Sequence, residues 1–222
     1  MWNDMPDESY SLKKAMNFIV EEPSIILPFI FGFIILAVFT VLVEASEFDI
    51  IAVYLKSGIP LYGFYLFLVS LVSNTIINFF LVLAIYWQTF SASDLVEKGS
   101  FSTRVSLSDA LASKGEIFLI AIFIAFIFLI FGYIPFVGVY IQALFTIIAY
   151  VSVILLNLNK KGLIHNMTEI TYTLSDYYKR EPTSALFIGL LMLVYIVPNA
   201  LLETLVIFVM VIYGSIVLKL LN

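Results

Sequence analysis

The sequence contains no cysteine and only one histidine, His165. The absence of cysteine excludes disulfide bonds, thiolate nucleophiles, iron–sulfur clusters and thiolate zinc sites within this chain. A single histidine is too little for a bis-histidine haem site or for a His-rich copper or di-iron cluster. The residues therefore predict neither a cofactor nor a metal site.

Charge is scarce as well. Only 12% of the 222 residues are charged and 62% are hydrophobic, with a mean hydropathy of +1.08. A soluble domain is typically about 25% charged and about 45–50% apolar. The net charge of −5 and the lack of any run of more than two basic residues argue against nucleic acid as a partner. We therefore predict an all-α integral membrane protein that forms one domain over residues 1–222.

No charge interrupts the stretch from Ile117 to Leu156, which contains 40 residues. A helix needs about 20 residues to cross a bilayer, so this stretch is twice too long for one crossing. Gly132, Pro135 and Gly138 lie at its centre and favour a turn there. The segment 116–157 is therefore predicted to form a transmembrane hairpin.

Four further apolar runs have the length of a membrane span, which gives six transmembrane helices arranged as three hairpins. The second run is long enough to exceed the hydrocarbon layer, and it places Trp87 and Gln88 at headgroup level. The last hairpin is short for two full crossings. The four runs are residues 23–43, 61–90, 185–202 and 204–221.

Each hairpin is predicted to follow an amphipathic helix that lies in the membrane interface, which we call an elbow. In the first elbow, residues 11–22, Leu12, Ala15 and Ile19 have helical spacing on one face. The second contains Ser106-Leu-Ser-Asp-Ala110, where Ser106 and Asp109 approximate a capping box. The third contains Thr173-Leu-Ser-Asp-Tyr177 within a basic loop. This order of parts predicts three repeats, over residues 11–90, 106–158 and 168–222.

Basic residues predict the orientation. If the N-terminus is in the cytoplasm, ten of the eleven basic residues lie on the cytoplasmic side, and only Lys56 lies outside. We therefore expect a multi-pass protein of the cell membrane with both termini in the cytoplasm.

No charged residue lies near the centre of a predicted span, and the deep polar side chains are neutral. Asn74 and Asn78 lie one turn apart on the second span, and Gln142 lies on the fourth. One interpretation is a polar lining for a small neutral solute or a lipid. The other is hydrogen bonding between packed helices, at about 0.6 kcal/mol for each bond.

Four basic residues flank the loop between the fourth and fifth spans. These side chains are candidates for binding anionic lipid headgroups or a protein partner, or they serve only to orient the chain. They are Lys160, Lys161, Lys179 and Arg180.

Catalytic motifs are missing from the sequence. It contains no H-E-x-x-H, no G-x-S-x-G and no aspartate pair within a span, and no serine has a histidine at a reachable depth. The protein is therefore predicted not to be an enzyme.

The S-L-x-x-A elbows at Ser11–Ala15 and Ser106–Ala110, together with the turn Ile134-Pro-Phe-Val-Gly138, carry a resemblance. The chain resembles a group of six-span prokaryotic membrane proteins of unknown function, largely archaeal, and more distantly the membrane domain of glycerophosphodiester phosphodiesterases. The catalytic domain of those enzymes has no counterpart here, so the resemblance implies an anchor or scaffold without chemistry of its own.

Two functions are consistent with these patterns. The favoured prediction is a non-enzymatic scaffold or accessory subunit of a membrane complex, which contacts lipid headgroups or a protein partner at the cytoplasmic face. The alternative is a transporter or channel for a small neutral solute or lipid, lined by Asn74, Asn78 and Gln142.

Overall fold

The computed structural model describes residues 10–35, 37–38, 40–42, 62–132, 134, 137–159, 162–197 and 200–221. Within these ranges every regular element is helical, and none is a strand. The prediction of an all-α protein is therefore confirmed for the described part of the chain. The elements in chain order are α1 (Tyr10–Glu21), η1 (Pro23–Ile26), α3 (Tyr62–Lys98), α4 (Thr103–Ala112), α5 (Lys114–Gly132), α6 (Gly138–Asn159), α7 (Leu163–Arg180), α8 (Pro182–Tyr195), α9 (Ala200–Val209), η2 (Met210–Gly214) and α10 (Ser215–Leu221).

Five of these helical segments are long and apolar enough to cross a membrane, which agrees with a membrane protein. They are Pro23–Leu42, Phe67–Lys98, Lys114–Phe131, Gly138–Asn159 and Leu202–Leu221. The fifth of the six predicted spans corresponds to α8, which is apolar but contains only 14 residues. At 1.5 Å per residue, α8 is about 21 Å long, whereas the hydrocarbon layer is about 30 Å thick.

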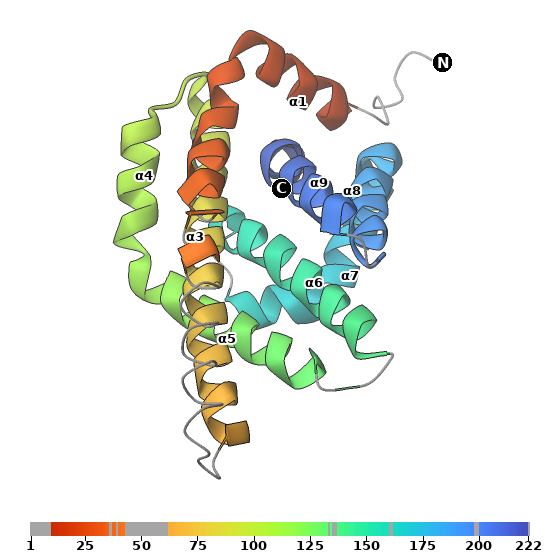
Figure 1. Ribbon diagram of the computed structural model, residues 1–222. Helices are drawn as coiled ribbons and strands as arrows, with labels where there is room; N and C mark the ends of the chain where they lie inside the picture. Colours follow the sequence, from red (N-terminus) through yellow and green to blue (C-terminus); the bar gives the residue numbers. More distant parts are fainter. Residues whose placement is uncertain are drawn as a thin grey trace, which may run out of the picture.

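Helix α3 is the central element of the fold (Figure 1). Its 37 residues extend over about 55 Å, so both of its ends would project beyond a hydrocarbon layer. The helix ends at Gly99, whose φ of +70° is the left-handed conformation that glycine adopts readily after a helix. Helices α5, α6 and α10 pack against α3, and its side chains from Leu81 to Leu95 are mostly buried.

Close backbone packing joins α3 to the segment Pro23–Leu42. A Cβ atom placed on Gly32 would lie 2.4 Å from the Cβ of Ala84, so only glycine fits here. Small residues at helix contacts allow this approach between membrane helices. Beside this contact, the ring of Phe31 stacks on Trp87 with centroids 6.5 Å apart.

Helices occupy the three segments where elbows were predicted, and two of these helices differ from the prediction in their bounds or length. Helix α4 begins at Thr103, and Ser106 is a fully buried residue inside the helix, not its cap. Helix α7 has 18 residues, whereas the prediction placed the elbow segment Thr173–Tyr177 within a basic loop. Its buried residues Asn166, Ile170 and Tyr177 recur at helical spacing. This helical pattern is hard to recognise in the sequence because charged residues are frequent in the segment.

The burial of α1 and α4 follows the shared S-L-x-x-A pattern. Ser11 and Ala15 in α1 are fully buried, and so are Ser106 and Ala110 in α4. In α7 the last residue of the corresponding segment, Tyr177, is buried as well. The first and last positions of the motif therefore face the protein in both S-L-x-x-A helices.

Two helix starts have the same local geometry. Glu22 precedes η1 with φ −131° and ψ 70°, and Glu181 precedes α8 with φ −139° and ψ 83°. In both, proline occupies the first turn, where its missing N–H costs nothing. Each glutamate also accepts a hydrogen bond from a serine in the turn that follows, Ser24 or Ser184. The junction between α4 and α5 has no proline and differs, with Ser113 at φ −88° and ψ 13°.

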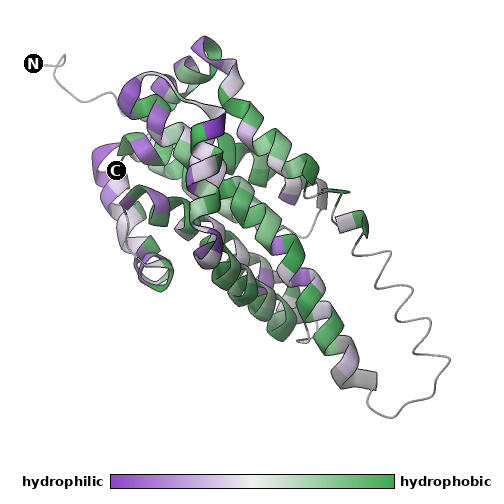
Figure 2. Cartoon of the chain, turned by 90° about the vertical axis from the view of Figure 1, so that its left-hand side faces the viewer, coloured by the Kyte–Doolittle hydropathy of each residue, from purple (hydrophilic) through white to green (hydrophobic). Residues whose placement is uncertain are grey.

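Hydrophilic residues gather toward the end of the molecule that carries both the N-terminus and the C-terminus, and the hydrophobic helices extend away from it (Figure 2). This distribution is typical of a helical membrane protein with one polar face near its termini. Pro135, in the predicted turn of the hairpin 116–157, lies outside the described residues.

Candidate functional site

The polar residues of α3 are bonded mainly within the helix itself. The Asn74 side-chain amide donates to the Ser70 carbonyl and the Asn78 amide donates to the Asn74 carbonyl, both at 2.8 Å. Thr75 donates in the same way to the Leu71 carbonyl at 2.7 Å. Such bonds to the preceding turn satisfy the polar groups without any ligand.

One hydrogen bond in this region joins two helices. The hydroxyl of Tyr150 on α6 donates to Oδ1 of Asn78 at 3.2 Å, and each residue is only 5% exposed. The polar stripe on α3 thus holds α6 in place, as expected for interhelical hydrogen bonding.

Gln142 is not hydrogen-bonded to the two asparagines of α3 within the described part of the chain. It lies half-buried near the start of α6, and no hydrogen bond between described residues joins it to Asn74 or Asn78. The three residues that the sequence grouped as a lining are therefore not one hydrogen-bonded cluster.

Gln88 is a buried polar residue that the sequence placed at headgroup level. Its side chain is 0% exposed, and neither amide atom has a hydrogen-bond partner among the described residues. Trp87, predicted at the same level, is 7% exposed and donates its indole N–H to the Thr103 carbonyl at 3.0 Å. Trp87 is thus bonded to the first residue of α4, which packs against α3.

Two serines complete the attachment of α4 to α3. The hydroxyls of Ser91 and Ser106 lie 2.7 Å apart, and Ser106 also donates to the Ser102 carbonyl at 3.0 Å. Both serines are fully buried. The spacing of Ser106 and Asp109 fits a capping box and therefore predicted a helix cap. In the structure Ser106 lies inside α4 and is buried against Ser91 of α3.

A second polar cluster joins the first helix of the chain to the start of α8, and we call it the Glu181 junction: Glu181, Ser11 and Ser184. The Glu181 carboxylate accepts hydrogen bonds from the backbone N–H of Ser11, the Ser11 hydroxyl and the Ser184 hydroxyl, each at 2.9 Å. Both serines are fully buried. The one sequence signal for this junction is the repeated Glu-Pro dipeptide at Glu22 and Glu181.

Three further contacts link distant segments near the same end. The Tyr213 hydroxyl donates to the Leu12 carbonyl, and Lys219 forms an ion pair with Glu97. The Arg180 guanidinium donates to the Leu221 carbonyl at 3.3 Å. Tyr213 lies in the π-helical turn η2, which interrupts the helix from α9 to α10.

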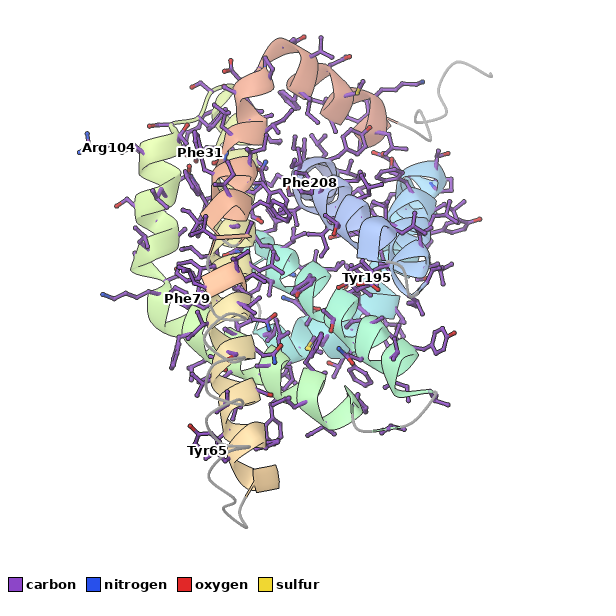
Figure 3. The ribbon with its side chains drawn as sticks, viewed as in Figure 1. Phe31, Tyr65, Phe79, Arg104, Tyr195 and Phe208 are labelled. Atoms are coloured by element: carbon purple, nitrogen blue, oxygen red, sulfur yellow. The ribbon has the colours of Figure 1, made fainter. Side chains whose placement is uncertain are left out.

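The predicted basic site is described only in part. Lys160 and Lys161 lie outside the described residues. The Lys179 side chain is 72% exposed and forms an ion pair with Asp176 at 3.0 Å. The Arg104 side chain on α4 points away from the bundle (Figure 3). Lys179 and Arg104 are thus accessible, whereas Arg180 is partly engaged by the C-terminal helix.

No group of three or more His, Asp or Glu side chains among the described residues is arranged to hold a metal ion. The ring of His165 pairs instead with Glu169 at 3.1 Å, on an exposed face of α7. No family model, curated protein or solved structure matches this chain.

Proposed function

We propose that this chain is a non-enzymatic, multi-pass protein of the cell membrane that acts as a scaffold or accessory subunit of a membrane complex. It crosses the membrane six times, with both termini in the cytoplasm. Five long apolar helices support five of the crossings. The remaining crossing, the fifth in chain order, is made by α8. Because α8 is about 9 Å shorter than the hydrocarbon layer is thick, this crossing requires a locally thinner bilayer.

The distribution of basic residues supports this orientation. With the N-terminus inside, ten of eleven basic residues are cytoplasmic, and such an excess sets the topology of membrane proteins. The hydrophilic end of the molecule, which carries both termini, then faces the cytoplasm (Figure 2).

In this proposal, α1, α4 and α7 are elbows in the cytoplasmic interface. Each comes directly before an apolar helix: Pro23–Leu42, α5 or α8. On α1, Met16 and Val20 are 56% and 68% exposed, which suits contact with lipid. The matching geometry at Glu22 and Glu181 supports a repeated unit, over residues 11–90, 106–158 and 168–222.

The observation that carries the scaffold proposal is the Glu181 junction. Two hydrogen bonds from Ser11 to Glu181 join the first helix of the chain to the start of α8, and a third, from Ser184, holds the same carboxylate. The ion pair Lys219–Glu97 joins the C-terminal helix to α3. A surface whose parts are already fixed loses little conformational entropy when a partner binds. The resemblance to membrane domains without chemistry of their own agrees with this proposal.

The partner is a protein or a lipid surface that contacts the basic side chains Lys160, Lys161, Lys179 and Arg180. Deleting the whole segment would be a poor test, because Ile170 and Tyr177 of α7 are part of the core. The better variant carries Lys160→Glu, Lys161→Glu and Lys179→Glu together. Lys56→Glu is the matched control, because Lys56 is the one basic residue assigned to the opposite side.

The experiment is to extract the tagged native protein in mild detergent and to determine the mass and composition of the particle. We expect a stoichiometric second protein with the wild type and with Lys56→Glu, and its loss with the triple variant. Partner retention that is equal in all three would overturn the role of the basic residues. A protein that is always recovered alone would overturn the scaffold proposal.

A transporter or channel for a small neutral solute or lipid is the second candidate. The observation in its favour is the pair of unbonded amide atoms on Gln88, together with the unbonded hydroxyls of Thr146 and Ser152. Asn74 and Asn78, in contrast, are bonded internally. Solute flux into vesicles that hold the protein alone, lost on Gln88→Leu, would favour this candidate.

A further inference from the structure

An apolar groove with a volume of about 450 Å³ runs along α8, where this helix packs beside α6 and α7. Its wall on α8 extends from Ala185 to Ile196, just beyond the end of the helix, and Leu144 of α6 contributes to another side. Gly189 lies on the wall, and a Cβ atom added there would meet no atom within 4 Å. The groove is therefore open at Gly189 and has room for an apolar ligand.

The third wall of the groove, on α7, carries hydroxyl groups. Thr171, Ser175 and Tyr178 line it at positions i, i+4 and i+7, and so they share one face of α7. Tyrosine at the membrane surface commonly places its ring in apolar surroundings and its hydroxyl at headgroup level. An apolar groove with hydroxyls along one wall matches an amphipathic ligand, with its chain on α8 and its polar end on α7.

The groove extends along most of α8. From Ala185 to Ile196 the chain rises about 16 Å, compared with about 21 Å for the whole of α8, which the proposed placement puts inside the bilayer. The exposed leucines beside the groove, Leu186, Leu190 and Leu193, leave it open to the surrounding lipid. A lipid of the leaflet on the α7 side thus has direct access.

We propose that this groove binds an apolar chain of a membrane lipid, whose polar end is hydrogen-bonded by the hydroxyls of α7. A groove of about 450 Å³ lies within the range of sites for small ligands, about 300–1,000 Å³. The hydroxyls on the α7 wall favour a lipid over a purely apolar partner helix, which would offer them no hydrogen-bond partner. The inference rests on the membrane placement proposed above but not on the scaffold role.

The test uses the full chain in phosphatidylcholine vesicles doped with phosphatidylcholine that carries a photoactivatable group on one acyl chain. After irradiation, labelled residues are mapped by peptide mass spectrometry. Gly189→Phe fills the groove, and Gly115→Phe is the matched control, because an added Cβ at Gly115 also meets no atom and Gly115 lies on α5 outside the groove.

We expect label concentrated on Leu186, Leu190 and Leu193, lowered about tenfold by Gly189→Phe, which corresponds to about 1.4 kcal/mol of binding free energy. Gly115→Phe should leave this label unchanged. Wild-type label as dense on the exposed α5 residues Phe118 and Leu119 as on α8 would overturn the inference even if Gly189→Phe fails to fold.

Other outcomes separate the groove from the membrane placement. Label on several apolar helices but not on α8 contradicts the groove alone. Absence of label from the whole chain contradicts the membrane placement itself. A co-purified protein cross-linked to Leu190, with no lipid label there, would assign the groove to a partner helix and overturn the lipid inference.

Discussion

The Glu181 carboxylate accepts two hydrogen bonds from Ser11, one from its backbone N–H and one from its hydroxyl, across 170 positions of sequence. An orphan N–H at the start of α1 and the hydroxyl beside it are thereby satisfied by the residue that begins α8. A helix cap is usually local, but here it connects the first helix of the chain to the start of α8. The junction is therefore the first contact to test by mutation.

Replacing Glu181 with Ala removes the acceptor for the buried Ser11 and Ser184 hydroxyls and should lower the free energy of unfolding by about 2–3 kcal/mol. Glu181→Gln keeps one acceptor oxygen and should cost less. The measurement is the thermal unfolding midpoint in mild detergent. Glu169→Gln is the control, because the exposed Glu169–His165 pair should contribute less than about 1 kcal/mol. Equal effects of the Glu181 and Glu169 variants would contradict the junction.

The contact between Asn78 and Tyr150 can be isolated by a double-mutant cycle. Asn78→Ala leaves the buried Tyr150 hydroxyl without an acceptor and should cost about 1–2 kcal/mol. Combined with Tyr150→Phe, the cycle should give a coupling free energy of about 0.6 kcal/mol. Gln142→Ala should be nearly neutral. A coupling of zero would show that the two side chains stabilise the fold independently.

The close packing of Gly32 against Ala84 predicts that no larger side chain is tolerated at position 32. Gly32→Ala should lower the free energy of unfolding by about 1–3 kcal/mol, because the new methyl group would overlap the Cβ of Ala84. Adding Ala84→Gly should restore much of the loss. At Gly115, where an added Cβ meets no atom, substitution by alanine should be neutral or slightly stabilising. The prediction fails if Gly32→Ala proves as harmless as Gly115→Ala.

The absence of native cysteine makes topology testable by single cysteines. In intact cells, a membrane-impermeant maleimide should label Ser57→Cys, because residue 57 is assigned to the outside. Ser100→Cys, just after α3, should react only once the membrane is made permeable, because residue 100 is assigned to the cytoplasm. The reverse pattern would invert the proposed orientation.

Much of the helical arrangement was predictable from local patterns. The hairpin at residues 116–157 matches α5 and α6 closely, because an uncharged run of that length permits few alternatives. Helix α1 begins within one residue of its predicted start. The predicted start of α4 was three residues too late, because the spacing of Ser106 and Asp109 resembles that of a capping box.

The candidate site was less predictable. Asn74, Asn78 and Gln142 share the chemistry of a polar lining, but the side-chain amides of Asn74 and Asn78 donate to the backbone of their own helix. The partner of Asn78, Tyr150, lies 72 residues away, and no local pattern links the two. Gln88 was expected near headgroups because the length of α3 alone does not reveal that other helices cover it.

Composition and the length of the apolar runs by themselves determined that this chain is helical and suited to a membrane, because every backbone group of a spanning segment must be satisfied within its own helix. Only the tertiary structure decided which polar residues are joined, as in Glu181 with Ser11. It also decided that α7 is a helix packed on the core and that a groove lies beside Gly189. These features depend on contacts between segments distant in sequence, which hydrophobic periodicity along one helix does not encode.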